Sequence, residues 1–242
     1  AYDIGNDDAL LKVIRSASIA CGFHGGDPNV MHRVVMGAKE NGVSIGVHPG
    51  FNDLWGFGRR RIDMKPNDLE YAVAYQIGAL QGMANYSGEK VTHLKPHGAM
   101  NNIAAEEPEV AMAIGRAIKA VDSNIIYVAL SGSEMERAAV KLDLPLAREG
   151  FADRHYDDEG NLASRKIEGT VIKDAELTKE RAIRMVVDGE IITLSGKTIK
   201  RQIDTICVHG DEPTSLLVAR AIREGLEGVG VSVVPLPEMS VV

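Results

Sequence analysis

The feature that most constrains the fold of this chain is a pattern that occurs four times: a short apolar run ends in a glycine-containing turn that carries a histidine. The runs are SIACGFHGGD (18–27), VSIGVHPG (43–50), VTHLKPHG (91–98) and TICVHGD (205–211). A strand that enters such a turn and presents a titratable side chain is typical of parallel α/β folds, which build their sites at the carboxyl ends of strands. The repetition therefore predicts one shared pocket at one end of a parallel sheet.

Segments with a helical spacing of apolar residues separate these runs, so the predicted elements alternate regularly. The predicted helices span residues 7–15, 28–40, 66–87, 106–121, 133–141, 178–187 and 213–227. The predicted strands begin near residues 18, 43, 91, 125, 145, 170, 204 and 231. About eight strands alternating with helices favour a closed (β/α) barrel, and an open doubly wound sheet is the alternative.

Two polar segments interrupt the alternation. Residues 49–61 hold the only tryptophan, Trp55, and residues 151–165 lack the apolar periodicity of either a helix or a strand. Both follow a predicted strand, and long loops at strand ends often contribute to a site. We expect both loops to serve the pocket, although the second would also fit a solvated surface loop. Residues 190–202 are expected to form a small excursion before the strand near residue 204.

Composition limits the class of protein. The chain has 242 residues, of which 45% are apolar and 25% are charged, and this predicts one globular domain over residues 1–242. A net charge of −7 argues against a nucleic-acid partner.

A signal peptide, a membrane-length apolar run and a cysteine framework are not evident in this sequence, which predicts a cytoplasmic protein without a membrane partner. Since the chain does not begin with Met, we expect that a native N-terminal segment is missing.

The four histidines that end the apolar runs are His24, His48, His97 and His209. Any one of them alone could be a buried core residue with satisfied nitrogens. In a parallel barrel, however, all strand carboxyl ends open on one face, so the four are expected to converge. The polar residues near them in sequence are Asp27, Asp53, Lys95, Asn101, Asp153, Arg154 and Asp211.

Three kinds of chemistry fit these residues. Imidazoles with carboxylates suit Zn²⁺ or a harder divalent ion, although the sequence has no HExxH or CxxC pair. Cys21 close to His24 would suit a thiol nucleophile, or it would simply be a small core residue. General acid–base chemistry on a small polar substrate is our preferred interpretation, because histidines exchange protons near neutrality and Lys95 can stabilise an anion.

Two further segments bear on anion and nucleotide binding. The run Arg59-Arg60-Arg61 is either a local anion contact or solvated loop charge. The residues SGKT at 195–198 resemble the end of a P-loop, but the first glycine of that motif would fall at Ile191. Any nucleotide would therefore have to bind through another geometry.

Five motifs taken together resemble the LamB/YcsF family over nearly the whole chain. They are CGFHGGD (21–27), GVHPGFND (46–53), LKPHGAMNN (94–102), EGFADRHY (149–156) and CVHGDEP (207–213). The resemblance implies a distorted (β/α) barrel similar to the glycoside hydrolase/deacetylase group. It also implies ATP-dependent hydrolysis of 5-oxo-L-proline to L-glutamate, by a prokaryotic 5-oxoprolinase in which this chain would be the A subunit beside two further subunits.

The resemblance further implies which residues form the site. The catalytic candidates are His24, Asp27, His48, Lys95, His97, Asp153, His209 and Asp211. The candidates for binding substrate or an anion are Asn101, Arg154, Gly25 and Gly26. The family opens with a strand of approximate sequence DLNCDLGES, which this sequence lacks, so we expect the first barrel strand and several acidic groups to be missing.

Several alternatives stay open. ATP is the expected co-substrate, whereas a divalent metal ion and a homo-oligomer are compatible with the sequence without being required by it. The chain could instead be a metal-dependent hydrolase or deacetylase of another small substrate, or a non-catalytic binding subunit.

Overall fold

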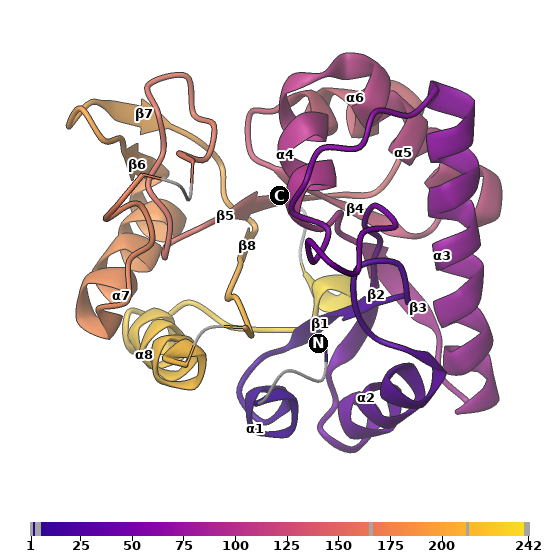
Figure 1. The fold of residues 1–242 in the computed structure, drawn as a ribbon. Helices are drawn as coiled ribbons and strands as arrows, with labels where there is room; N and C mark the ends of the chain where they lie inside the picture. Colours follow the sequence, from indigo (N-terminus) through magenta and orange to yellow (C-terminus); the bar gives the residue numbers. More distant parts are fainter. Residues whose placement is uncertain (1, 3–5, 165–166, 212, 240–242) are drawn as a thin grey trace.

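The computed structural model describes residues 2, 6–164, 167–211 and 213–239. A parallel sheet forms its centre and curls into a half-barrel (Figure 1). In spatial order, its strands are β1 (Ser16–Ala20), β2 (Ser44–His48), β3 (Val91–Leu94), β4 (Ile126–Leu130), β5 (Leu146–Gly150) and β8 (Thr205–Ile206). Because the sheet follows the chain order and every pair is parallel, the carboxyl ends of all these strands lie at the same edge.

Helices connect the strands and cover the convex side of the sheet (Figure 1). They are α1 (Asp7–Leu11), α2 (Pro28–Glu40), α3 (Pro66–Tyr86), α4 (Gly98–Glu106), α5 (Pro108–Val121), α6 (Glu134–Leu142), α7 (Ala175–Ile183) and α8 (Ser215–Gly228), with a π-helical turn η1 (Arg184–Asp188) and a 3₁₀ turn η2 (Leu236–Glu238). Helix α5 packs between α3 and α6, and α7 packs on α8. None of the described helices is long and apolar enough to cross a lipid bilayer.

The predicted α/β architecture is confirmed, but two predicted strands are wrong. Near residue 170 the structure has only an isolated bridge between Val171 and Arg154. Residues 231–234 have the apolar alternation of a strand, yet the described part of the chain places no strand beside them to complete a ladder. The parallel sheet of the described residues therefore has fewer strands than the predicted barrel.

The excursion predicted at residues 190–202 is an antiparallel hairpin of β6 (Glu190–Ile192) and β7 (Thr198–Lys200). Its turn contains Ser195, Gly196 and Lys197. A P-loop leads from a strand into a helix, so these residues do not have P-loop geometry.

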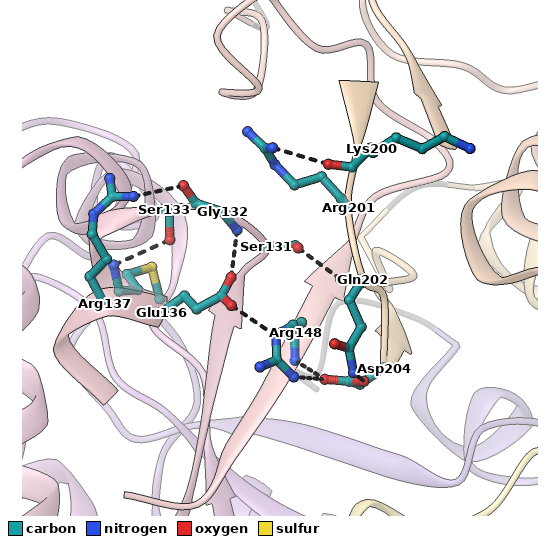
Figure 2. Close-up of polar contacts among 11 residues, drawn as sticks. Ser131, Gly132, Ser133, Glu136, Arg137, Arg148, Lys200, Arg201, Gln202 and Asp204 are labelled. Atoms are coloured by element: carbon teal, nitrogen blue, oxygen red, sulfur yellow. Dashed lines mark hydrogen bonds and ion pairs between the residues drawn. The ribbon is translucent and has the colours of Figure 1, made fainter. Parts of the chain in front are cut away.

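A polar network ties the segment that returns from this hairpin to the central sheet (Figure 2). The Ser131 hydroxyl donates to the carbonyl of Gln202 over 2.7 Å. Arg148 on β5 lies between two carboxylates, at 2.8 Å from Glu136 and 3.2 Å from Asp204. These contacts set the position from which β8 starts, and β8 carries the last of the four histidine turns.

Candidate functional site

Three of the predicted histidines form one cluster, which we call the histidine cluster: His24 after β1, His48 at the end of β2 and His97 after β3. Their candidate ligand nitrogens all lie within 4.8 Å of one another. The rings of His24 and His97 stack with their centroids 3.9 Å apart. All three side chains are buried, so the strand-end turns bring these histidines together as predicted.

Two backbone carbonyls fix the tautomers of His48 and His97. Nδ1 of His48 lies 2.6 Å from the carbonyl of Lys95, and Nε2 of His97 lies 2.7 Å from the carbonyl of Phe57. Since a carbonyl can only accept, both nitrogens carry the proton. The other two nitrogens, Nε2 of His48 and Nδ1 of His97, face each other at 3.1 Å. In neutral rings, both of these facing nitrogens have lone pairs.

Burial keeps these rings neutral. It lowers the pKa of His24 to about 2 and the pKa of His97 to about 4, and it lowers the pKa of His48 well below its usual value. Neither nitrogen of His24 has a hydrogen-bond partner in the described part of the chain. The Tyr2 hydroxyl lies 2.9 Å from Nε2 of His48 and 3.3 Å from Nδ1 of His97. The single hydroxyl proton of Tyr2 is therefore close to the lone pairs of both nitrogens.

Glycines make room for the histidine cluster. A Cβ atom on Gly50 would lie 2.4 Å from Nδ1 of His24. A Cβ atom on Gly58 would lie 2.7 Å from Cβ of His24 and 2.9 Å from Cδ2 of His97, and Gly58 has a φ of +64°. The loop after β2 therefore closes over the rings only because these positions have no side chain.

We expect Gly58→Ala to lower the free energy of unfolding by about 1–3 kcal/mol, through backbone strain and the clash with the rings. Gly82→Ala is the matched control, because Gly82 lies in α3 with no atom within 4 Å of the added Cβ. The control should gain about 0.5–1 kcal/mol from helix propensity. Urea denaturation of both variants measures the difference, and equal stabilities would contradict this view of the cluster.

A buried ion pair lies beside the cluster. The ammonium of Lys95 is 2.6 Å from Oε1 of Glu149 and 2.8 Å from Sγ of Cys207. Burial opposes the charge on Lys95, but the carboxylate of Glu149 acts in the opposite direction, and the pKa of Lys95 is raised. Burial also raises the pKa of Glu149, although Lys95 acts in the opposite direction. Burial raises the pKa of the Cys207 thiol to about 12, so this thiol is protonated at neutral pH.

The fourth histidine lies on a different wall of the site. Nδ1 of His209 is 2.6 Å from Oδ2 of Asp153. The ring of Phe151 lies 5.7 Å from the ring of His209 and 4.7 Å from Nζ of Lys95, between the two. His209 does not join the histidine cluster because β8 is separated from β1–β3 by β4 and β5 in the sheet. We call His209 with Asp153 the dyad.

One cavity of about 790 Å³ is lined by residues of the histidine cluster, of the buried ion pair and of the dyad. It is lined by the site candidates His48, Lys95, His97, Asn101, Arg154, His209 and Asp211. Asp211 forms an ion pair with Arg59, and the guanidinium of Arg154 donates to the carbonyl of Ala163 over 2.5 Å. Of the three arginines at 59–61, Arg60 binds Asp53 and Arg61 binds Glu107, so the cationic run is paired with carboxylates of this chain.

The structure does not bring every candidate to the cavity. Asp27 is exposed and its carboxylate accepts from the backbone N–H of Val30, which makes it the N-cap of α2. Gly25 packs against Phe57, and Gly26 has a φ of +75° with its missing Cβ 2.8 Å from the carbonyl of Ala20. None of these three residues lines the cavity, and the catalytic candidates His24 and Asp153 do not line it either. The predicted roles of all five residues stay predictions.

Asp27 can be tested by separating capping from chemistry. Asp27→Ala should cost about 1 kcal/mol of stability, whereas Asp27→Asn should retain most of it, because asparagine caps helices about as well. If capping is the only task of Asp27, Asp27→Asn also keeps wild-type turnover in the assay described below. A loss of turnover in a fully stable Asp27→Asn variant would show that the Asp27 carboxylate takes part in the reaction.

Some residues of the site were not predicted. They are Tyr2, Phe57, His93 and Glu149. His93 was detectable, since it lies on β3 two positions before Lys95, which continues the extended chain directly after this strand, so both side chains point to the same face. Glu149 was detectable as a charged residue at the end of an apolar strand. The contacts of Tyr2 and Phe57 depend on loop paths that the pattern does not predict.

Among the described residues, the histidine cluster is the group of His, Cys, Asp and Glu side chains with the geometry to hold a metal ion. The dyad offers a different chemistry. With Nδ1 of His209 held by a carboxylate, Nε2 is left to exchange a proton. The site therefore combines three neutral imidazoles, one buried ion pair and one carboxylate-oriented histidine.

Comparisons with known proteins agree with this architecture. A relative from Gluconobacter oxydans (strain 621H), named as the A subunit of a 5-oxoprolinase, is 50% identical over 232 residues, which cover 96% of this chain and 91% of that protein. A relative of the same name from Rhodopseudomonas palustris (strain BisB5) is 49% identical over 236 residues, covering 97% and 93%. The crystal structure of a lactam utilization protein from Thermus thermophilus matches with a TM-score of 0.90 at 42% identity, covering 98% and 94%.

The family comparison matches nearly the whole chain. The model of the LamB/YcsF family aligns with residues 1–241, which include all five motifs that carried the resemblance. The chain belongs to the LamB/YcsF family.

Proposed function

We propose that this chain is the A subunit of an ATP-dependent 5-oxoprolinase, in which it helps to open the lactam ring of 5-oxo-L-proline to give L-glutamate. The observation that carries this proposal is the match with relatives named as 5-oxoprolinase A subunits, at 50% identity over 96% of this chain. The lactam utilization protein with the same fold supports the same substrate class.

The chemistry explains why such a reaction would need ATP. A five-membered lactam resists hydrolysis because the amide nitrogen delocalises its lone pair into the carbonyl. Transfer of a phosphoryl group to the amide oxygen would make the ring carbon electrophilic enough for attack by water. The ring C–N bond would then break as the nitrogen takes up a proton, which would leave an acyl phosphate. A second water would hydrolyse this acyl phosphate to the side-chain carboxylate of glutamate and inorganic phosphate.

The cavity has groups suited to the hydrolytic half of this reaction. Nε2 of His209, oriented through Asp153, would take the proton from the attacking water. Lys95 and Arg59 would stabilise negative charge on the substrate carboxylate or on the developing oxyanion. The cavity of about 790 Å³ would hold 5-oxoproline together with part of a partner or co-substrate.

We further propose that two partner subunits bind ATP and carry out the activation, while this chain supplies the hydrolytic cavity, and that the complex is cytoplasmic. The relatives are named as one subunit of an enzyme, which supports a multi-subunit assembly. The hairpin turn at Ser195–Lys197 does not have P-loop geometry, which favours binding of ATP by another route.

Reconstitution tests the proposed function. The chain is mixed with its two partner subunits, and release of glutamate from 5-oxoproline is followed with and without ATP. We expect turnover only when this chain, both partners and ATP are all present. Equal turnover without this chain would refute the proposal.

A second candidate is a metal-dependent hydrolase or deacetylase of another small substrate. The histidine cluster favours it, because three imidazoles suit a catalytic zinc ion with an open coordination position. This candidate predicts bound metal and activity that a chelator removes. Turnover that is indifferent to chelator would exclude it, whereas any turnover by the isolated chain would exclude a purely non-catalytic binding subunit.

A further inference from the structure

We infer that His24, His48 and His97 bind one divalent transition-metal ion of the Zn²⁺ class. The inference concerns the side chains of this chain alone, so it stands or falls separately from the proposed 5-oxoprolinase activity. It is carried by the direction of the ring nitrogens, by the burial of the rings and by the backbone carbonyls that hold two of them.

The first step is the pair of facing nitrogens. Nε2 of His48 and Nδ1 of His97 lie 3.1 Å apart, and both are unprotonated because the other nitrogen of each ring donates to a carbonyl. The Tyr2 hydroxyl lies 2.9 Å from the first nitrogen and 3.3 Å from the second, and its single proton can satisfy only one of these two lone pairs. Two nitrogens on a tetrahedral zinc ion, each about 2.0–2.1 Å from the metal, lie about 3.3 Å apart. The pair is therefore spaced almost as two ligands of one ion.

The second step is the outer hydrogen bonds. Histidines that bind metals typically donate their other N–H to a carbonyl or a carboxylate, which fixes the tautomer and aims the lone pair. The carbonyls of Lys95 and Phe57 do this for His48 and His97. The local path of the chain sets the position of each carbonyl. Lys95 comes directly after β3, and Phe57 lies in the loop that closes over the rings at Gly58.

The third step is His24. Its side chain is 1% exposed, and neither ring nitrogen has a hydrogen-bond partner among the described residues. Leaving such a group unsatisfied costs about 1–3 kcal/mol. Its ligand nitrogen already lies within 4.8 Å of the other two. If the His24 ring rotated toward the other two rings, this nitrogen would bind the ion as its third ligand. The free-energy cost of leaving the nitrogen without a partner would then be removed.

The donor set also selects the ion. Three neutral imidazoles without a carboxylate suit Zn²⁺ and its substitute Co²⁺ better than Mg²⁺ or Ca²⁺, which prefer oxygen ligands. The carboxylate of Glu149 is held by Lys95 and that of Asp153 by His209, so both are engaged outside the cluster.

The experiment measures metal binding by the full chain without partners, ATP or substrate. The protein is stripped with a chelator, dialysed, and titrated with Co²⁺, whose visible absorption reports tetrahedral nitrogen coordination, and Zn²⁺ is then added as a competitor. We expect about one Co²⁺ per chain, displaced by Zn²⁺, with elemental analysis confirming the stoichiometry.

Two variants locate the site. His24→Gln removes a ring that has no hydrogen bond to lose, so it is the variant least prone to unfold, and His48→Gln removes a second ligand. Each should weaken Co²⁺ binding by more than about 100-fold, which exceeds the effect of losing an outer-shell partner. His209→Gln is the matched control, a cavity histidine outside the cluster, and it should bind Co²⁺ like the wild type.

Circular dichroism and thermal melting confirm that each variant is folded. The inference is overturned if the stripped wild-type chain takes up no stoichiometric ion. It is also overturned if folded His24→Gln and His48→Gln bind Co²⁺ as tightly as the wild type. Either result would leave the reconstituted glutamate assay unaffected as a test of the proposed function.

Discussion

Replacing Lys95 with methionine is expected to lower the free energy of unfolding by about 3–5 kcal/mol, because it strands a buried carboxylate without its cation. Lys95 is 8% exposed and Glu149 is 4% exposed, so water cannot replace the lost ammonium. Methionine fills nearly the same volume, which leaves charge as the main change. The reconstituted enzyme should also lose turnover if Lys95 stabilises an anion. Urea denaturation and the glutamate assay measure the two effects.

The double variant Lys95→Met with Glu149→Gln separates structure from chemistry. Removing both charges should restore most of the stability, because a neutral amide no longer needs the buried cation. Turnover should stay low, since the cationic side chain is still absent. A single Lys95→Met variant with wild-type stability would contradict the buried ion pair, and a double variant with full turnover would remove Lys95 from the mechanism.

His209→Gln is expected to reduce kcat of the reconstituted enzyme by about 10²–10⁴-fold, the usual contribution of a positioned general base. Glutamine can still donate to Asp153 and fill the space beside Phe151, but it cannot accept a proton at neutral pH. KM for 5-oxoproline should change less than kcat, because the loss falls on the chemical step. Steady-state kinetics of glutamate release give both constants.

Asp153→Asn and His32→Gln complete this test. The asparagine can hold His209 in the wrong tautomer, so kcat should fall. His32 lies on α2 beside Tyr86, away from the cavity, and its replacement should leave both constants unchanged. A His209→Gln enzyme with wild-type kcat would show that the dyad does not perform the proton transfer.

The sequence predicts an element well where local signals agree. Helix α2 begins at Pro28 and ends at Glu40 as predicted, because a capping aspartate, a first-turn proline and an Asn-Gly stop all indicate the same bounds. Helix α4 was missed, since Gly98 at its first position and Pro108 just after it resemble loop signals. The apolar alternation of 231–234 suggested a strand, but a strand also needs a partner that local sequence cannot supply.

The candidate site also has one part that the sequence predicts and one part that it does not. Convergence of His24, His48 and His97 was predictable, because successive parallel strands deliver their end turns to one edge. The separation of His209 from the cluster depends on how far β8 lies from β1 in the sheet, which the pattern of turns does not encode. The pairing of Lys95 with Glu149 was likewise hidden, since Lys95 follows β3 and Glu149 lies on β5, with no local sign in the sequence of either that the other is near.

The brevity of β8 has a consequence for how the cavity responds to a ligand. This strand joins the sheet through only the pairs Glu149–Thr205 and Gly150–Ile206, so much of its placement rests on the Arg148 network that precedes it. The wall with the histidine cluster is built on longer ladders, with five pairs between β1 and β2 and three between β2 and β3. We therefore expect a ligand that spans the cavity to draw His209 toward Lys95, rather than the reverse. Closure of this site would then be a movement of the wall that carries β8.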